Sequence, residues 1–469
     1  MRGISAAGVY VPRYRLRTDE LEEAWGVSHA VGVDRKAVPA ADEDALTMAI
    51  TASERALNDA AIDPSTISLV VTATTTPPLD ESDLTSRLIR ALGLPAEIRT
   101  ATSTQHTAAG AEAIARALDA DGPALVAVSD CPEGEPAEGD HPLGAGAAAF
   151  IVDDDPAVEL RDMTWRADEA PGIRFRQRGD RKTESLDITT YGRNAIRDAV
   201  GHTVGSLDID LESVAAAAIY QPDGKLPYRA SRDLPIDNQA VQAGTVVDRI
   251  GDAGAATVPI GLLFALADDT ADLSVAAFFG GGGTASALAC SGNLQAKGLA
   301  DLDDGEVLPY AEYLRKRGYV VSGDVAGGGA HVSLPNWRRS LDQRYRLVAG
   351  RCPDCNGITF PPEGACQECH SRVEFERVET ARSGTIRALT VIGQGGAPPE
   401  FTELQQREGS YAVAIVALEA GDGEATLPAQ ITDVDPETVA VGDTVRATIR
   451  RIYTQEGVPR YGVKFKLVD

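Results

Sequence analysis

Four cysteines in the C-terminal third have the spacing of a metal site. The segment "CPDCNGITFPPEGACQEC" holds Cys352, Cys355, Cys366 and Cys369 in the pattern C-x2-C-x10-C-x2-C. Each pair directs two thiolates at one centre, and two pairs complete the tetrahedral shell of four sulfurs that suits zinc. The alternative is four free thiols in a site that has lost its metal. Because sulfur fills all four positions, His370 is not needed as a ligand. We therefore expect one structural zinc per chain.

A second stretch has the form of a nucleophile site without an obvious nucleophile. In "TSTQHTAAGAEAIARAL" (102–118) a polar turn leads into a helix whose first turn contains only small residues. Such a start allows close approach to the backbone and favours a nucleophilic or anionic group. The turn offers only Ser103, Thr104, His106 and Thr107, and a threonine hydroxyl needs an adjacent base to attack a thioester. His106 is next to Thr107, but neighbours on a helix face different ways, so we interpret His106 as a polar helix-start residue.

The remaining cysteines are weak candidates for a reactive thiol. Cys131 follows a strand in "VAVSDCPEGE", and Cys290 ends one in "ALACSG". Neither begins a helix that would lower its pKa. We interpret both as small packing residues.

The elements around these residues alternate in the manner of an α/β layered domain. Helical stretches such as "DALTMAITASERALNDAAI" and "YGRNAIRDAVGHTVGSL" alternate with short apolar strands such as "ALVAVSD" and "VAAAAIYQP" over residues 1–290. Strands that alternate with helices imply a layered α/β domain. The same rhythm occurs twice, which suggests a duplicated unit.

The pattern changes after residue 320. The Gly-rich segment "VSGDVAGGGAHV" begins a linker and lead-in helix over 321–340, because such composition is typical of linkers. The cysteine pairs follow in a zinc ribbon over 341–380. Five short strand-like runs separated by turns occupy 381–469 with no helix of note, which favours a small closed β-barrel. Residues 1–320 form the first domain in this prediction.

The charge balance narrows the class of partner. The 469 residues include 44 basic and 70 acidic residues, a net charge of −26, and only seven of the basic residues are lysines. The acids are spread along the chain, and such a surface suits a cytoplasm at molar salt, where repulsion is screened. We expect a cytoplasmic protein of a halophile and no nucleic-acid partner, since a nucleic acid requires the opposite charge.

Targeting and membrane signals are not expected either. The opening "MRGISAAGVYVPRYRLR" lacks the continuous apolar core of a signal peptide. No apolar run approaches the roughly 18–20 residues that span a bilayer. We expect no membrane association.

The C-terminal third resembles a known module. The cysteine pairs are preceded by "WRRSLDQRYRLVAGR" and followed by five strands that end in "RYGVKFKLV". Over about 335–469 this arrangement is similar to the acyl-CoA-associated family with a rubredoxin-like zinc ribbon and an OB-fold. The resemblance implies a module that is not catalytic itself, accompanies thiolase-superfamily enzymes and helps to hold coenzyme A.

The first 320 residues resemble archaeal hydroxymethylglutaryl-CoA synthase, which has the thiolase-like α-β-α-β-α fold. The resemblance rests on five short motifs in the right order, namely "GVYVPRYRL", "VPAADEDALTMA", "YGR", "QPDGKLP" and "LPYAEYLRKRG". Separate chains of these two families act together, so their fusion supports both resemblances.

The resemblance also identifies what has been replaced. The family's nucleophilic Cys corresponds to Thr107, its His to Tyr220 and its general acid/base Glu to Thr74, while an Asn that holds the thioester falls near Asp252. Tyr220, with a pKa of about 10, cannot move protons near pH 7 as a His does. If the alignment slips, Asp80 or Glu81 replaces the Glu, but no slip restores the Cys. We therefore expect no catalytic residues at these positions.

Other parts of the family pattern persist. "QPDGKLP" retains Gly224 and Lys225, and with Arg229 these are candidate contacts to coenzyme A, although a surface lysine is the simpler reading of Lys225. The segment "FFGGGGTASA" (278–287) lacks the Lys-Ser/Thr of a phosphate loop. It either lets backbone amides approach a thioester, as the family's loop does, or forms a tight turn.

These expectations combine into a functional hypothesis. The chain is expected to be a non-catalytic acyl-CoA-associated subunit that docks on an active thiolase (acetyl-CoA C-acyltransferase). It is expected to self-dimerise through its thiolase-like domain. One alternative is an active hydroxymethylglutaryl-CoA synthase-like acyltransferase with altered residues, and a weaker one is an acyl-CoA carrier or sensor.

Overall fold

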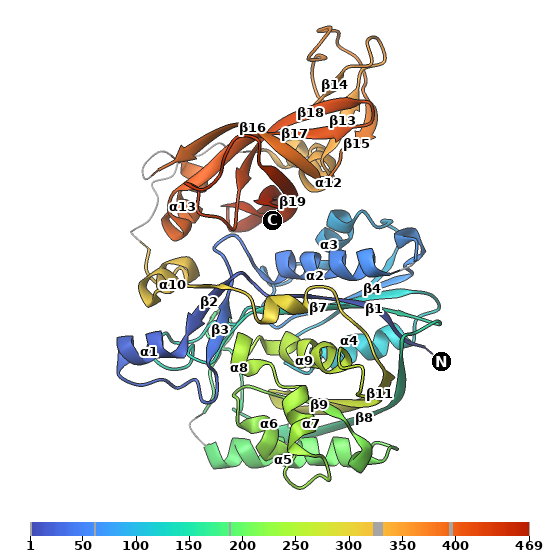
Figure 1. Ribbon diagram of the computed structural model, residues 1–469, viewed down its shortest axis with the longest axis vertical. Helices are drawn as coiled ribbons and strands as arrows, with labels where there is room; N and C mark the ends of the chain where they lie inside the picture. Colours follow the sequence, from blue (N-terminus) through green and yellow to red (C-terminus); the bar gives the residue numbers. More distant parts are fainter. Residues whose placement is uncertain (1, 61, 187–188, 322–331, 394–396, 469) are drawn as a thin grey trace. The chain divides into compact units, whose positions relative to one another are not determined.

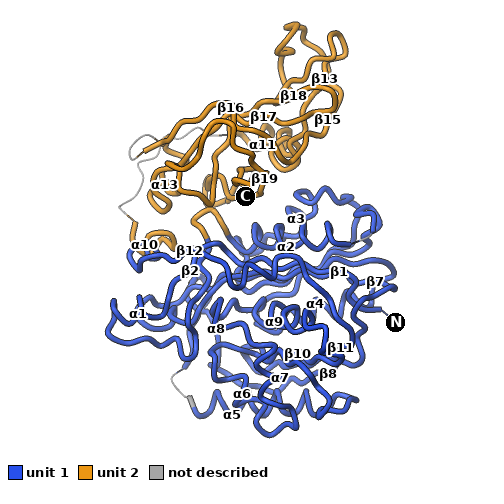
Figure 2. Tube along the Cα trace, viewed as in Figure 1, with its two compact units in different colours: residues 1–39, 44–314 blue, residues 40–43, 315–469 orange. Residues whose placement is uncertain are grey.

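The chain forms two compact units. The computed structural model describes the chain except for residues 1, 61, 187–188, 322–331, 394–396 and 469. The first unit comprises Met1–Pro39 and Asp44–Leu314, and the second comprises Ala40–Glu43 and Arg315–Asp469 (Figure 2). Most of the Gly-rich stretch expected to be a linker lies outside the described residues.

A single sheet runs through the first unit. Within the described residues it has nine strands in the order β5-β4-β6-β7-β1-β8-β11-β10-β9. A short pairing of β1 with β8, from Gly3 and Ile4 to Glu159 and Val158, joins two halves. The strands are β1 (Gly3–Tyr10), β4 (Leu69–Ala73), β5 (Arg99–Ser103), β6 (Ala124–Asp130), β7 (Gly146–Asp153), β8 (Val158–Ala170), β9 (Ala216–Ile219), β10 (Leu273–Gly280) and β11 (Gly282–Gly292).

Helices cover both halves of this sheet and fill the space between them. Helices α2 and α3 pack on the half that contains β1 and β4, α4 and α9 lie between the halves, and α5 packs on β8 and β11 (Figure 1). This arrangement gives the α-β-α-β-α layers predicted from the sequence. The layer helices are α2 (Ala45–Asp59), α3 (Thr85–Leu92), α4 (Ala109–Leu118), α5 (Thr189–Gly205) and α9 (Thr257–Leu266).

The smaller elements of the first unit form its edge. Strands β12, β2 and β3 pair in that order as a small sheet. Their bounds are β2 (Tyr14–Arg17), β3 (Arg35–Val38) and β12 (Glu306–Val307), and the shorter helices are α1 (Thr18–Trp25), α6 (Leu226–Ala230), α7 (Asn238–Ala243) and α8 (Val247–Ile250). Helix α10 (Tyr310–Arg317) begins in the first unit and ends in the second.

The small residues at the start of α4 have a packing reason. A Cβ at Gly110 would lie 3.1 Å from Cγ of Pro259 and 3.3 Å from the carbonyl oxygen of Ala255. Helix α9 is apolar on all sides and buried along nearly its whole length, as expected for a central layer. The small side chains of α4 therefore allow the two central helices to pack closely.

The second unit combines a three-stranded ribbon with a closed barrel. The ribbon strands pair in the order β14-β13-β15, and the barrel order is β16-β17-β18-β20-β19. Helix α13 lies between β16 and β17, which corrects the expectation of a barrel without a notable helix. The bounds are α11 (Leu334–Arg339), α12 (Leu341–Arg346), β13 (Val348–Arg351), β14 (Ile358–Thr359), β15 (Glu376–Glu379), β16 (Ser383–Ile392), α13 (Thr402–Glu408), β17 (Tyr411–Ala420), β18 (Gly423–Ile431), β19 (Thr444–Gln455) and β20 (Val458–Leu467).

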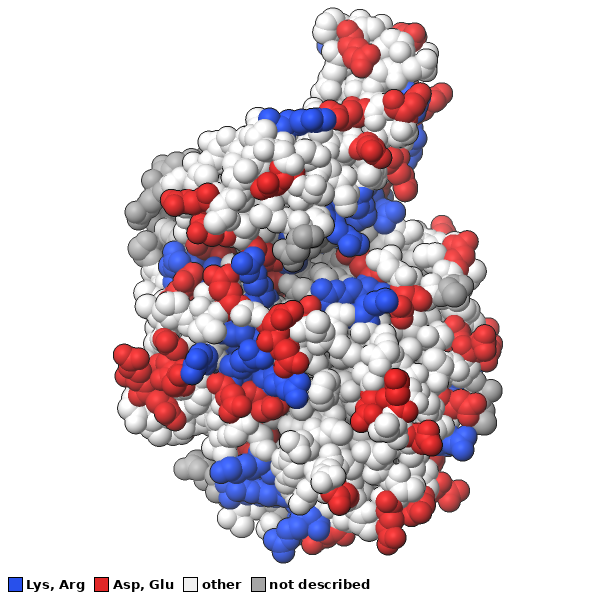
Figure 3. Space-filling view, viewed as in Figure 1, with Lys and Arg blue, Asp and Glu red and all other residues white. Residues whose placement is uncertain are grey.

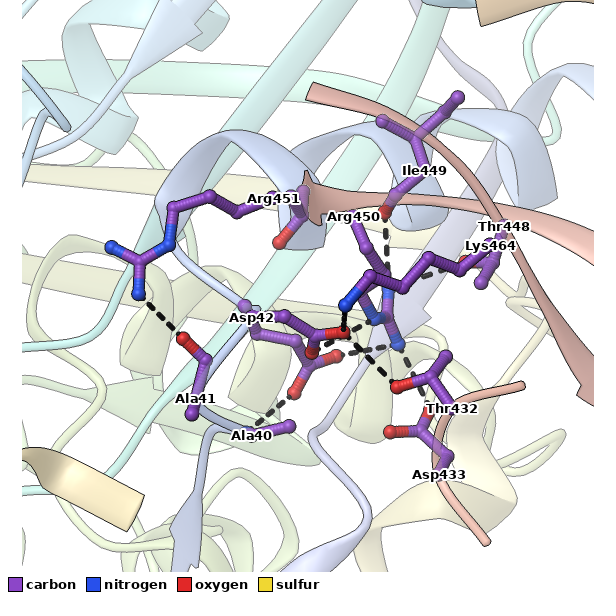
Figure 4. Close-up of polar contacts among 12 residues, drawn as sticks. Ala40, Ala41, Asp42, Thr432, Asp433, Thr448, Ile449, Arg450, Arg451 and Lys464 are labelled. Atoms are coloured by element: carbon purple, nitrogen blue, oxygen red, sulfur yellow. Dashed lines mark hydrogen bonds and ion pairs between the residues drawn. The ribbon is translucent and has the colours of Figure 1, made fainter. Parts of the chain in front are cut away.

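The four residues Ala40–Glu43 belong to the barrel unit by their contacts. The main-chain N–H of Arg451 donates to the carbonyl oxygen of Asp42 at 3.0 Å. The Arg451 guanidinium donates to the carbonyl oxygen of Ala41 at 2.7 Å (Figure 4). A segment distant in sequence from the barrel strands is thus hydrogen-bonded along β19.

A buried cluster of charges fixes this segment to the barrel. Asp42 lies 2.7 Å from Nζ of Lys464, and Nη2 of Arg450 lies 2.8 Å from Glu43 and 2.9 Å from Asp433 (Figure 4). All five side chains are buried. Burial alone would raise the pKa of Asp42, but Lys464 and Arg450 outweigh it and hold this pKa below its ordinary value. The cluster is therefore charged and internally paired.

Acidic side chains are distributed over the face seen in Figure 3, with basic groups among them, rather than gathered at one end. Among the described helices, none is long and apolar enough to cross a bilayer.

Candidate metal centre and buried polar site

The four cysteines of the ribbon meet at one point. Their Sγ atoms all lie within 4.8 Å of one another. The Cys352–Cys369 and Cys355–Cys366 sulfur pairs are separated by 3.7 and 3.6 Å. Four sulfurs about 2.3 Å from a tetrahedral zinc are about 3.8 Å apart, so the cluster fits the metal without rearrangement.

The knuckle backbones supply hydrogen bonds to the thiolates. The N–H of Gly357 donates to Sγ of Cys355 at 3.4 Å. The N–H groups of Cys369 and Glu368 lower the pKa of Cys366 to about 6. Donors directed at sulfur favour the thiolate form that zinc requires. This is a four-cysteine zinc ribbon, and with four sulfur ligands its metal has no open position for catalysis.

Thr107 lies just before α4, at the place expected for a nucleophile. Its side chain is buried, and its hydroxyl donates a 2.6 Å hydrogen bond to the main-chain carbonyl oxygen of Phe279. The hydroxyl proton is thus held by a backbone carbonyl, which is too weak a base to activate it. Four glycines (280–283) follow Phe279 and span the end of β10, the turn and the start of β11.

Tyr220 follows β9 and interacts with the Thr107 hydroxyl. The phenol is buried, and burial raises its pKa despite the opposing effects of Arg174 and of the hydrogen bond with Thr107. At neutral pH the ring therefore carries a neutral hydroxyl. Such a group can donate a hydrogen bond, but it cannot relay protons as an imidazole does.

A buried ion pair completes this polar centre. Nη1 of Arg174 donates to Oδ2 of Asp252, and both side chains are largely withdrawn from solvent. Although burial opposes it, Asp252 raises the pKa of Arg174 above its ordinary value. Asp252 also accepts from the N–H of Gly254 at 2.9 Å and from Thr257 at 3.2 Å. Asp252, near which the resemblance places the family's thioester-holding Asn, is therefore engaged by its neighbours.

Asp130, at the end of β6, organises the loop that carries Thr74. Its carboxylate accepts hydrogen bonds from the hydroxyls of Thr74, Thr75 and Thr76 at 2.8 to 2.9 Å. It also accepts from the N–H of Ala255 at 2.7 Å. A fully buried carboxylate that accepts this many hydrogen bonds is held rigidly in place. Sequence reasoning missed Asp130, whose position at the carboxyl end of a buried strand was the available signal.

The other candidate groups near this centre are occupied elsewhere. Nε2 of His106 lies 3.2 Å from Oε1 of Glu112 on α4, consistent with a helix-start residue rather than a base for Thr107. Asp80 and Glu81 are exposed on the loop after β4, whereas Thr74 is buried. Burial raises the pKa of Cys290 to about 12, so this thiol is inert near neutral pH.

Cys131 is half-buried beside the Asp130 loop. Its N–H donates to the hydroxyl of Thr76 at 3.0 Å, and its sulfur lies 3.9 Å from the same hydroxyl. The chain therefore places this thiol next to the threonine loop.

The candidate coenzyme A contacts lie around the start of α6. Asp223 accepts from the N–H groups of Lys225 and Leu226 at 2.7 and 2.8 Å and so shapes this turn. Gly224 has a packing reason, since a Cβ there would lie 2.1 Å from the carbonyl oxygen of Gly32. Lys225 and Arg229 are both exposed, and no described carboxylate forms an ion pair with either. Both cations are accessible to an anionic ligand.

Family models match the second unit. A model described as "ChsH2, rubredoxin-like zinc ribbon domain" matches residues 339–376, and one described as "ChsH2, C-terminal OB-fold domain" matches residues 377–450. The ribbon, its four cysteines and the five-stranded barrel agree with both descriptions.

Curated relatives and solved structures match the first unit. The hydroxymethylglutaryl-CoA synthase of Pyrobaculum neutrophilum is 30% identical over 342 residues, which cover 67% of this chain and 97% of the relative. That of Methanopyrus kandleri is 28% identical over 285 residues, 56% of this chain and 79% of the relative. A crystal structure of HMG-CoA synthase complexed with CoA superposes with a TM-score of 0.61 at 18% identity, over 71% of this chain and 94% of that one.

These matches confirm the predicted fold, a thiolase-like α/β domain with a zinc ribbon and an OB-fold. Tyr220 interacts with the Thr107 hydroxyl, and Thr74 donates a hydrogen bond to Asp130 at the end of β6. The chain belongs to the hydroxymethylglutaryl-CoA synthase family and carries ChsH2-type zinc ribbon and OB-fold domains at its C-terminal end.

Proposed function

We propose that the chain is a non-catalytic, acyl-CoA-associated subunit that docks on an active thiolase. The observation that carries this proposal is the hydrogen bond between the Thr107 hydroxyl and the carbonyl oxygen of Phe279. A nucleophile for acyl transfer needs a base on its proton, and here a backbone carbonyl holds that proton while Tyr220 stays neutral. Among the described contacts none joins a thiolate or an imidazole to the Thr107 hydroxyl, although Nη2 of Arg174 and Nδ1 of His106 are buried without a hydrogen-bond partner.

The proposed partner and ligand rest on the family resemblance and on two exposed cations. The family resemblance of the zinc ribbon and OB-fold implies a module that accompanies thiolase-superfamily enzymes. A solved structure with the fold of the first unit is complexed with CoA. The exposed Lys225 and Arg229, with Gly224 between the tyrosine and the helix, supply cationic contacts for the phosphates of coenzyme A. The chain itself forms a dimer through its thiolase-like unit in this proposal.

The acidic composition supports a salt-rich cytoplasm as the setting of this assembly. A net charge of −26 repels itself at low ionic strength, and molar salt screens that repulsion. The proposal therefore includes a halophilic, cytoplasmic setting and no nucleic-acid partner.

A specific observation favours an active enzyme as the second candidate. Asp130 holds three threonines and the Ala255 N–H in a rigid loop, and Arg174 brings a cation to the centre. A preorganised polar centre of this kind can stabilise charge in an acyl-transfer transition state. A free-standing acyl-CoA carrier or sensor is the third and weaker candidate.

Purification from the native host at high salt, with mass spectrometry of co-eluting proteins, tests the proposal. We expect a stoichiometric thiolase whose activity falls when this chain is removed. Labelled acetyl-CoA should leave no acetyl group on the purified chain. An acetyl group that appears on the wild type and is lost in Thr107→Val would establish the enzyme instead. Stoichiometric coenzyme A binding without any partner would favour the carrier.

A further inference from the structure

Arg460 on β20 is a buried cation without an acceptor. Its exposed fraction is 8%, and its Nε is buried with no hydrogen-bond partner. Among the described residues none forms an ion pair or accepts a hydrogen bond from its guanidinium. Arginine is almost never buried unless it is paired, because desolvating its charge is costly. Arg460 therefore lacks the anion that its environment requires.

Another buried arginine of the same barrel is paired with carboxylates. Arg450, on the adjacent strand β19, has an exposed fraction of 0% and lies within 2.8 Å of Glu43 and 2.9 Å of Asp433. Its charge is thus balanced by the chain itself. Arg460 differs from Arg450 because no described carboxylate lies within ion-pair distance of it.

A second guanidinium, that of Arg344, contacts the same aromatic ring as Arg460. Cζ of Arg344 lies 4.2 Å from the centre of the Trp337 ring, and Cζ of Arg460 lies 5.1 Å from it. Burial and the like charge of Arg460 lower the pKa of Arg344. Glu363 acts on Arg344 electrostatically but forms no ion pair with it. Stacking on an indole stabilises a cation by about 0.5–2 kcal/mol. Of the Arg344 donors, Nε donates a hydrogen bond to the hydroxyl oxygen of Ser340 at 2.7 Å.

Tyr453 adds a third donor without a partner. Its exposed fraction is 6%, its ring centre lies 6.1 Å from that of Trp337, and its buried hydroxyl has no hydrogen-bond partner. Arg344 and Arg460 both act on it electrostatically, so the three polar groups are neighbours. Two guanidiniums and a phenol supply more donors than the chain uses here.

We propose that Arg344, Arg460 and Tyr453 form a binding site for a phosphate group, with Trp337 as its wall. Guanidinium groups bind phosphate oxygens bidentately, and a phosphate carries the double negative charge that two arginines balance. Inorganic phosphate and the phosphates of coenzyme A share this chemistry. That coenzyme A is the natural ligand rests on the proposed function. The phosphate site itself is argued independently of that function.

Tryptophan fluorescence and calorimetry of the full chain at constant chloride test the site. The probes are inorganic phosphate, coenzyme A and pantetheine, which lacks phosphate. We expect the two phosphate-bearing probes to bind and to change the emission of Trp337, and Trp337→Phe to remove the change. Arg460→Gln should weaken phosphate binding by about tenfold or more, because it removes a charge-assisted bond. Pantetheine should not bind.

Matched variants keep the test decisive. Arg338 is an exposed arginine on α11, and Arg338→Gln should bind as the wild type does. Arg460→Lys keeps the charge but loses the bidentate geometry, so it provides a second measurement if Arg460→Gln does not fold. Zinc content and circular dichroism report folding in each case.

The outcomes separate this inference from the proposed function. Coenzyme A affinity that is unchanged in both Arg460 variants would overturn the phosphate site and leave the proposed function intact. Binding of phosphate without coenzyme A would support the site and contradict the coenzyme A role. A wild-type chain that binds neither phosphate-bearing probe would overturn the site.

Discussion

The hydroxyl of Thr107 donates a hydrogen bond to the carbonyl oxygen of Phe279, 2.6 Å away. This contact connects the start of α4 with the end of β10 and gives the hydroxyl a structural role. The polar centre around it consists of pairwise interactions, among them Thr107 with Tyr220 and Arg174 with Asp252. Single substitutions can therefore test one interaction at a time.

Replacing Thr107 with Val removes the hydroxyl and keeps the shape of the side chain. The Phe279 carbonyl then lacks this donor, so the free energy of unfolding should fall by about 1–2 kcal/mol. Denaturant titration measures this change. If the chain is non-catalytic, the activity of its thiolase complex should not change. A complex whose condensation activity disappears with Thr107→Val would identify the hydroxyl as a nucleophile.

The raised pKa of Tyr220 predicts a loss of stability in alkali. Burial raises this pKa in the folded chain, whereas the unfolded chain ionises the phenol at about 10. The unfolded state therefore releases a proton first, and the folded state loses stability as the pH rises above that value. Denaturant titrations between about pH 8 and about pH 11 bracket the ordinary tyrosine pKa. They measure the slope of the free energy of unfolding against pH.

Tyr220→Phe serves as the control for that slope. The variant cannot ionise at this position, so its free energy of unfolding should fall less steeply with pH than that of the wild type. Parallel slopes for the two proteins would show that the phenol ionises as readily in the folded chain as in the unfolded chain.

Replacing Asp42 with Asn tests the charge cluster of the barrel. The carboxylate lies 2.7 Å from Lys464, and its loss leaves a buried ammonium unbalanced. Breaking such a buried pair costs about 3–5 kcal/mol. Asp19→Asn, in the exposed pair with Arg17, should cost less than about 1 kcal/mol. Denaturant titration of the full chain at neutral pH compares the two variants.

The lowered pKa of Asp42 also fixes the direction of its pH dependence. Its stabilising contribution is present above the unfolded pKa of about 3.9 and is lost as the pH falls through the lower folded value. The difference between the wild type and Asp42→Asn should therefore shrink in acid. A difference that is the same at neutral and acidic pH would contradict a charged, paired Asp42.

Local patterns were sufficient to predict most of the architecture. Alternating apolar runs predicted the strands and helices of the first unit, and cysteine spacing predicted the ribbon, because both signals lie within a few residues. Asp44 shows this at the scale of one turn, since it caps α2 through the N–H of Thr47 at 3.1 Å. Such contacts depend on neighbours in sequence and so can be read there.

Long-range polar contacts could not be predicted in this way. Asp42 and Lys464 meet across more than 400 positions, and Asp130 meets the Thr74 loop from a different strand. Periodicity says that a residue is buried but not which distant group it meets. Arg460 illustrates the limit, since nothing in the residues around it indicates that its side chain is buried.

Removing one ribbon cysteine tests the zinc assignment. Cys366→Ser removes one of four sulfurs that lie within 4.8 Å of one another, so the site keeps three thiolates and an unsuitable hydroxyl. Because metal binding and folding of such a ribbon are coupled, the variant should lose its zinc and unfold the ribbon. A chromogenic chelator measures zinc released per chain, with one equivalent expected for the wild type. Cys131→Ser lies in the first unit and should retain that equivalent. Full zinc content in Cys366→Ser, or loss of zinc in Cys131→Ser, would show that the metal is held elsewhere.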